Sequence, residues 1–250
     1  MHLPRSLASP MLLLGLALIG GEAFAGDLQL QIAAWDHDAR GSARDAQGAV
    51  DFDTLGVEGK TEPYARLFWR QEDGSWWPDL ALTYCRLRGS GSNVVREPVT
   101  IGGIAVLPGG TAAADADVHD TTLTLSYPLL RRVVAFDAGL SLRTLAGDIL
   151  IRNEDSASSD RQHIDPLFPL LTATLALPIG PRFSLVGNGS WISRGNDVAY
   201  ELYAGLDALL WRSLSLQAGW MRKRYDVEQQ DYRLDATLGG LRAGLSWRFE

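Results

Sequence analysis

The segment GLRAGLSWRF at positions 240–249 alternates apolar and polar side chains along its length. This period of two is typical of a β-strand, because successive side chains of a strand point to opposite faces, whereas a helix repeats near 3.6 residues. The segment therefore predicts a strand with one apolar and one polar face. Its apolar face carries Leu241, Ala243, Leu245, Trp247 and Phe249.

The same alternation recurs throughout the chain and predicts an all-β fold. It occupies residues 27–34, 65–70, 79–84, 120–127, 134–143, 171–177, 183–191, 200–207 and 214–220. With residues 240–249 these segments make about ten strands, within a range of eight to twelve.

The lengths of the connections separate two architectures that share this alternation, a soluble β-sandwich or barrel and a membrane-spanning antiparallel up-and-down β-barrel. Short links and long links fall on opposite ends of the strands, as in outer-membrane barrels, where turns face the periplasm and loops face outward. We therefore predict an outer-membrane barrel, with the loop at residues 89–117, which carries the apolar stretch 99–107, as a binding or lid element. The short links are residues 71–78, 128–132, 178–181 and 210–212, and the long ones are 37–62, 89–117, 146–164 and 225–239.

The N-terminus predicts export from the cytoplasm. Arg5 precedes an apolar run at residues 11–19, and the small-residue pattern Ala23-Phe24-Ala25 follows. This is the layout of a secretory signal peptide, so residues 1–25 are expected to be removed and residues 26–250 to form the barrel. No later run of 18 apolar residues predicts a transmembrane helix.

Composition excludes several function classes. The 250 residues are 46% hydrophobic and 21% charged, which excludes a disordered chain, and one cysteine excludes an internal disulfide. The net charge of −7 argues against a nucleic-acid partner. Four scattered histidines predict neither a zinc site nor another metal centre, and no cofactor is expected.

Charged side chains on the polar face of the strands predict the character of the lumen. Buried charges are costly unless they are paired, so we expect ion-pair networks across the interior and a plugged or very narrow lumen. A role in solute selectivity is the alternative to a purely structural role. The candidates are Arg66, Arg70, Asp79, Asp120, Asp137, Arg143, Glu201, Asp207, Arg242 and Arg248.

Two kinds of barrel enzyme are the catalytic alternatives. A lipid A deacylase would need a histidine that activates a serine, yet strand parity turns His119 toward lipid with Thr121, and Asp120 and Ser126 toward the lumen. An omptin-like protease would need acid and histidine pairs at the outer rim. Its candidates are His37, Asp38, Asp115, Asp117 and His119.

A calcium site and a cysteine are two further candidates for a functional role. Calcium favours carboxylate oxygens, and two acidic groups lie close together in sequence, without an EF-hand or repeat spacing. Cys85 is expected to be a small lumen or wall residue. The acidic groups are Asp51 with Asp53, and Asp115 with Asp117 and Asp120.

Several short motifs carry a resemblance to known proteins. The final strand, with Leu245, Trp247 and Phe249, looks like the terminal signal that the outer-membrane assembly machinery reads, although Glu250 follows the last aromatic residue. The motifs VDFDTLGV at 50–57, EPYA at 62–65, HDTTLTLSY at 119–127 and the glycine pair at 239–240 resemble a family of bacterial outer-membrane β-barrel proteins of uncharacterised role, labelled by a Gly-Gly pair. The resemblance implies fold and location and no activity.

We therefore expect a non-enzymatic integral outer-membrane barrel in a structural, binding or small-solute pore role. Its expected partners are outer-membrane lipid and lipopolysaccharide and the outer-membrane assembly machinery; the ligand is unknown. A soluble periplasmic β protein is the alternative without a membrane.

Overall fold

The computed structural model describes residues 26–72, 75–101, 103–156, 158–194, 197–229 and 232–249. The predicted signal peptide at residues 1–25 lies outside the described residues. Within the described ranges, no helix is long and apolar enough to cross a bilayer.

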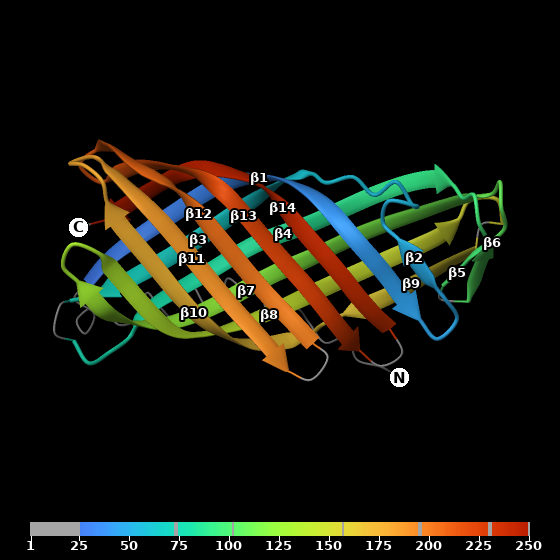
Figure 1. Cartoon of the computed structure of the whole chain (residues 1–250), viewed down its shortest axis with the longest axis horizontal. Coiled ribbons are helices and arrows are strands. Elements are labelled where there is room, and N and C mark those ends of the chain that lie inside the picture. Colours follow the sequence, from blue (N-terminus) through green and yellow to red (C-terminus); the bar gives the residue numbers. More distant parts are fainter. Residues whose placement is uncertain are drawn as a thin grey trace, which may run out of the picture.

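The main sheet closes into a barrel of ten antiparallel strands, as predicted (Figure 1). β9 and β10 pair with successive stretches of β8 and together act as one interrupted strand. Pairing of β14 with β1 and of β10 with β8 completes the ring. The strands are β1 (Gly26–Asp45), β3 (Thr61–Gln71), β4 (Asp79–Val94), β7 (Thr111–Arg131), β8 (Ala135–Asn153), β9 (Ser158–Ile164), β10 (Leu167–Pro178), β11 (Phe183–Arg194), β12 (Asp197–Trp211), β13 (Leu214–Gln229) and β14 (Tyr232–Phe249).

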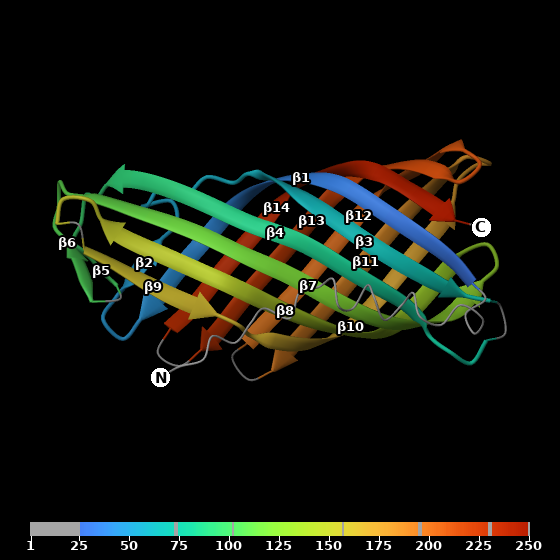
Figure 2. The same cartoon turned by 180° about the vertical axis from the view of Figure 1, so that it is seen from behind.

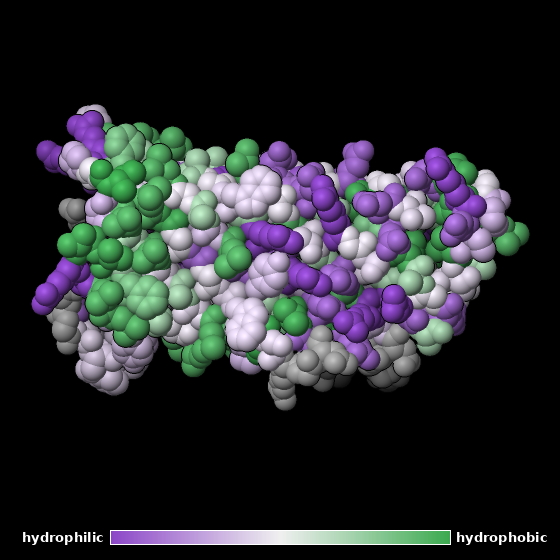
Figure 3. Space-filling view, viewed as in Figure 1, coloured by the Kyte–Doolittle hydropathy of each residue, from purple (hydrophilic) through white to green (hydrophobic). Residues whose placement is uncertain are grey.

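An apolar belt surrounds the outside of the barrel at the rim where the described chain begins and ends (Figure 3). A closed barrel with such a belt is a form in which strands cross a bilayer, because every backbone polar group is paired within the wall. The described strands therefore have the architecture of an outer-membrane β-barrel. Exposed residues of the belt include Leu28, Ile32, Leu123, Leu125, Leu140, Leu142, Leu171, Leu175, Leu202, Trp220, Leu241, Leu245 and Trp247.

The barrel extends far beyond this belt. The 20 residues of β1 span about 66 Å at roughly 3.3 Å each, which is about 50 Å of height at a tilt near 40°, against a belt of about 25 Å. We call the belt end the membrane half and the rest the projecting half (Figure 2). The outward residues change from Ala34 to Asp36 and from Trp220 to Arg222 at the boundary.

The prediction of long loops is wrong for most of the residues concerned, which form strands instead. Residues 37–62, 89–117, 146–164 and 225–239 were expected to be loops, yet most of them continue the barrel wall. The prediction failed because the apolar face changes sides at the boundary. In β14, Leu241 faces outward, whereas Leu238, Ala236 and Leu234 face inward and are buried, and the glycine pair 239–240 lies at the change.

Two long connections remain at the projecting end. Residues 46–60 contain β2 (Ala49–Asp51), which pairs with β1, and residues 95–110 contain the hairpin of β5 (Val99–Ile101) and β6 (Ile104–Val106). Because β3 begins only at Thr61, whereas β1 and β4 extend farther into the projecting half, residues 52–60 lie along the gap between these two strands. Backbone bonds from His37 to Lys60 and from Glu58 to Ser90 anchor them on either side.

The opposite rim has the short turns, at residues 72–78, 132–134, 179–182 and 212–213. In an outer-membrane barrel this rim faces the periplasm. The segregation of turns and long connections therefore agrees with the expected orientation, although only the connections 46–60 and 95–110 are long.

Candidate functional site in the barrel interior

The interior of the barrel contains a buried ion-pair layer between two different chambers. Four charged side chains make the layer, two acidic and two basic, so that their formal charges cancel. They are Asp120, Arg143, Glu201 and Lys223, with side chains at most 6% exposed.

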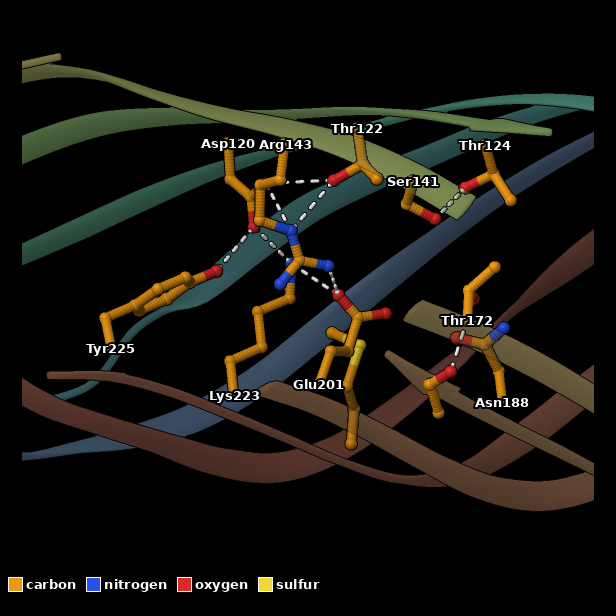
Figure 4. Close-up of polar contacts among 12 residues, drawn as sticks. Asp120, Thr122, Thr124, Ser141, Arg143, Thr172, Asn188, Glu201, Lys223 and Tyr225 are labelled. Carbon is orange, nitrogen blue, oxygen red and sulfur yellow. Dashed lines mark hydrogen bonds and ion pairs between the residues drawn. The ribbon is translucent and has the colours of Figure 1, made fainter. Parts of the chain in front are cut away.

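The contacts of the layer cross the whole lumen (Figure 4). The Lys223 ammonium lies 2.6 Å from a carboxylate oxygen of Asp120, and β13 and β7, which carry them, lie on opposite sides of the ring. Lys223 also lies 3.3 Å from Glu201, and Arg143 binds both carboxylates. Each charge therefore has two partners of opposite sign, the arrangement that offsets the cost of burial.

Neutral groups complete this layer. The hydroxyl of Tyr225 donates to Asp120 at 2.7 Å, and Nε of Arg143 donates to the Thr122 hydroxyl at 2.9 Å. The Lys223 nitrogen lies 5.6 Å from the ring centre of Trp35, which is fully buried. These contacts leave the middle of the lumen filled by side chains.

A polar chamber lies between this layer and the rim of short turns, which is the expected periplasmic side. It has a volume of about 230 Å³, and its lining reaches strand ends near the rim at Arg70, Ser184 and Ser215. We call it the arginine chamber. Its charged lining is Arg66, Arg70, Arg242 and Arg248, with Asp137 and Asp207.

The acidic groups near this rim already have partners. Arg131 binds Asp137 and lies 3.4 Å from Asp79, and Asp79 also accepts a bond from the backbone N–H of Gln71 at 2.8 Å. Asp207 accepts a 2.7 Å bond from the side-chain amide of Gln217. Arg131 therefore joins Asp79 and Asp137 at this rim, and Arg70 lies within electrostatic range of the same two carboxylates. None of the four chamber arginines forms an ion pair with a described residue.

The second chamber lies in the projecting half and is apolar. Its volume is about 90 Å³, and its lining is almost entirely carbon. Leu87, Val118 and Ile149 contribute from the wall, and Val50 and Leu55 from the connection 46–60, with Leu55 only 1% exposed. We call it the apolar chamber. The hairpin β5–β6 packs at this end through the buried Ile104 and Val106.

The ten predicted lumen residues all face the interior, but they form three groups rather than one network. Asp120, Arg143 and Glu201 meet in the central layer, and Asp79 and Asp137 meet at Arg131. Ion pairs are predicted for all ten residues, but the other five form none with a described residue. These five are Arg66, Arg70, Asp207, Arg242 and Arg248.

The candidate protease residues do not converge. His37 faces inward and is 3% exposed, whereas its neighbour Asp38 faces outward. Asp117 binds Arg86 on the outer face, and Asp115 binds Arg152. Strand parity separates such neighbours, because adjacent residues of a strand lie on opposite sides of the wall.

The remaining candidates also stand apart. His119 is exposed at the edge of the belt, and its Nδ1 lies 2.7 Å from the Tyr84 hydroxyl. Asp51 and Asp53 are exposed in the connection 46–60, and the described residues contain no group of three or more His, Cys, Asp or Glu side chains placed to hold a metal ion. Cys85 is buried in the wall, 0% exposed.

His37 is the most unusual ionisable group of the projecting half. Burial lowers the pKa of its imidazole, and the nearby Glu62 carboxylate opposes this shift only in part. Its ring lies 4.4 Å from the ring of Trp35. The folded barrel therefore favours the neutral imidazole.

The sequence pattern does not identify Lys223, Tyr225 and Arg131. The first two lie beyond the end of the strand predicted at residues 214–220, and Arg131 lies within a predicted turn. The parity of β13 would have identified Lys223 and Tyr225, because they continue the inward series of residues 217, 219 and 221. Lys223 and Tyr225 are identified when each predicted strand is extended until a turn residue appears in the sequence.

The sequence matches no protein-family model and no curated protein. Three similar solved structures are bacterial outer-membrane barrels. The translocator domain of the autotransporter NalP from Neisseria meningitidis is 11% identical, with 91% of this chain and 90% of that chain covered and a TM-score of 0.49. The transport unit of the autotransporter AIDA-I from Escherichia coli is 9% identical, with 94% of each chain covered and a TM-score of 0.45. Neisserial surface protein A is 11% identical, with 90% and 100% covered and a TM-score of 0.36.

Proposed function

We propose that this protein is a closed, non-enzymatic outer-membrane barrel that works by binding rather than by conduction. The observation that carries the proposal is the ion-pair layer. Its groups are nearly inaccessible to water, and one of its contacts joins strands on opposite sides of the ring. Ions crossing the lumen would have to displace paired, desolvated charges, which is costly.

The binding role is supported by the two chambers on either side of the layer. A chamber that is closed at one end can hold a ligand but gives it no path along the lumen. The absence of an enzymatic role is supported by the placement of the histidines, since His37 is buried in the lumen, whereas His119 lies on the outer face against Tyr84 and near Asp117, away from His37.

The proposed partners follow from the outer face. Outer-membrane lipid would surround the belt, and lipopolysaccharide would meet Arg222, which is exposed directly beyond Trp220. The assembly machinery would read β14, where Trp247 and Phe249 stack with their ring centres 6.0 Å apart. Membership of the group labelled by a Gly-Gly pair stays a prediction.

Conductance in a planar bilayer tests the closed lumen. The test uses refolded protein whose folding is checked by its shifted gel mobility before boiling. The wild type should be silent. A variant with alanine at all four charged positions of the layer, Asp120, Arg143, Glu201 and Lys223, should show discrete conductance steps, because it removes the bridges and leaves the net charge unchanged.

A matched variant controls for charge removal. It replaces two ion pairs on the outside of the wall by alanine, Arg86 with Asp117 and Arg152 with Asp115, and it should stay silent. Steps in the wild type would refute the closed lumen. Silence of the four-alanine variant would show that the ion-pair layer is not the seal.

A further inference from the structure

The arginine chamber holds more positive charge than its own carboxylates balance. Four arginines and two aspartates line it, a formal excess of two positive charges. Adding Arg131 and Asp79 leaves this excess unchanged. Asp137 is engaged by Arg131, whereas Asp207 accepts a bond from the neutral amide of Gln217 and keeps its charge, which the excess of two already counts.

The arginines lie together on one wall of the chamber. Arg66 and Arg70 belong to β3, and Arg242 and Arg248 belong to β14, and these two strands flank β1. Through the register, Gln29 of β1 pairs with Arg248 and Gln31 pairs with Arg66. The result is a wall rich in guanidinium and amide groups that also carries one carboxylate toward the rim, Asp27 of β1, the register partner of Arg70.

Arg242 is buried without an ion pair, although the Glu201 carboxylate of the central layer lies within electrostatic range of it. It is 4% exposed, and its guanidinium carbon lies 3.6 Å from the ring centre of Tyr203 and 4.4 Å from that of Tyr64. It forms no ion pair with a described residue; its Nη1 lies 3.8 Å from the sulfur of Met221. A buried charge of this kind is costly without a partner of opposite sign.

Aromatic rings hold the guanidinium groups and leave their N–H groups free to bind a ligand. Arg66 and Arg70 both lie near the ring of Phe68, at 5.3 and 5.5 Å. A ring over the face of a guanidinium stabilises the cation and leaves the N–H groups at its edge available. Those edges match the two oxygens of a carboxylate or phosphate.

We propose that the arginine chamber binds a small anionic solute that carries carboxylate or phosphate groups and enters from the periplasmic rim. The chamber volume of about 230 Å³ is many times the roughly 10–15 Å³ that one buried water needs on the same measure, so it admits a compact organic anion. The central ion-pair layer closes the chamber on the other side. A conducting barrel could bind the same anion, so this inference stands or falls separately from the closed lumen.

Calorimetric titration of the folded protein in neutral detergent tests the site. The probes are citrate and inorganic phosphate at low ionic strength, with the polyamine spermidine as a probe of opposite charge. We expect saturable binding of one anion per chain, weakened by added salt because the attraction is electrostatic. Spermidine should not bind to the chamber.

Three variants assign the binding to the chamber. Arg242→Gln and Arg66→Gln should each weaken anion binding by at least about tenfold, a loss of roughly 1.4 kcal/mol. Arg212→Gln removes the same charge from an exposed turn at the same rim and should leave the affinity within about twofold. Arg66→Gln carries the test alone if Arg242→Gln fails to fold.

Two results would overturn the proposal. One is the lack of saturable binding of either anion to the wild type up to millimolar concentration, which would leave Arg242 as a cation held by its tyrosines alone. The other is equal weakening in Arg212→Gln and the chamber variants, which would show attraction to the net charge of the rim.

Discussion

The membrane half and the projecting half of this barrel use opposite faces of the same strands. On β7, Leu123 and Leu125 face outward in the membrane half, whereas Val118 and Ala114 face inward in the projecting half. The outward residues of the projecting half on this strand include Asp115 and Asp117, each paired with an arginine. One continuous strand is thus a membrane strand at one end and a strand of a water-soluble barrel at the other.

This inversion sets the nature of each chamber. In the membrane half the apolar face is needed outside, against lipid, so the lumen receives the polar residues and becomes the arginine chamber. In the projecting half water lies outside, so the lumen receives the apolar residues and becomes the apolar chamber. The ion-pair layer marks the level at which the lining changes from polar to apolar.

Truncating an inward leucine of the projecting half should give the largest loss of stability. Leu87 is 7% exposed and lines the apolar chamber, so Leu87→Ala should cost about 2–5 kcal/mol through lost burial and an enlarged cavity. Leu82→Ala on the same strand changes an outward side chain of the belt and should cost less, since lipid chains fill the space. Reversible denaturant titration in lipid vesicles measures both. Equal losses would contradict the distinction between the two faces.

An outward arginine should have opposite consequences in the two halves. Leu140 is 62% exposed in the middle of the belt, and Leu140→Arg should cost about 2–4 kcal/mol, because it places a charge at mid-depth in lipid. Leu150→Arg lies on the same strand beyond the boundary, between Asp115 and Arg161, and should change stability by no more than about 0.5 kcal/mol. The same titration applies. A comparable loss in Leu150→Arg would place this residue inside the membrane.

The sequence predicted the membrane half better than the projecting half. The alternation of apolar and polar residues, with the apolar side outward, identifies every barrel strand, and all ten charged lumen candidates face inward. The same pattern predicts loops where the apolar face changes sides, as between Leu241 and Leu238, although the residues there belong to the wall.

The central site was predictable only in part for the same reason. Asp120, Arg143 and Glu201 lie within predicted strands, whereas Lys223 lies just beyond the predicted end of its strand. Which charges meet across the lumen depends on strand order and stagger. A period of two contains neither, so which of the inward charges form ion pairs could not be foreseen.

Acidification should give the smallest effect, confined to the projecting half. His37 is buried there and its pKa is lowered from the ordinary value of 6.5. Below that value the unfolded chain binds a proton that the folded barrel resists, so stability is complete above about pH 6.5 and is lost as the pH falls toward the folded pKa.

The histidine responsible can be identified by comparing unfolding free energies near pH 7.5 and near pH 5.5, the range in which histidine titrates. His37→Phe keeps a ring beside Trp35 and should remove the part of the loss that His37 contributes. His163→Gln changes a histidine whose side chain is 65% exposed and should retain the loss. If the loss persisted in His37→Phe and vanished in His163→Gln, the pH response would arise on the outer surface. Burial of an ionisable ring would then not be a difference between the projecting half and the membrane half.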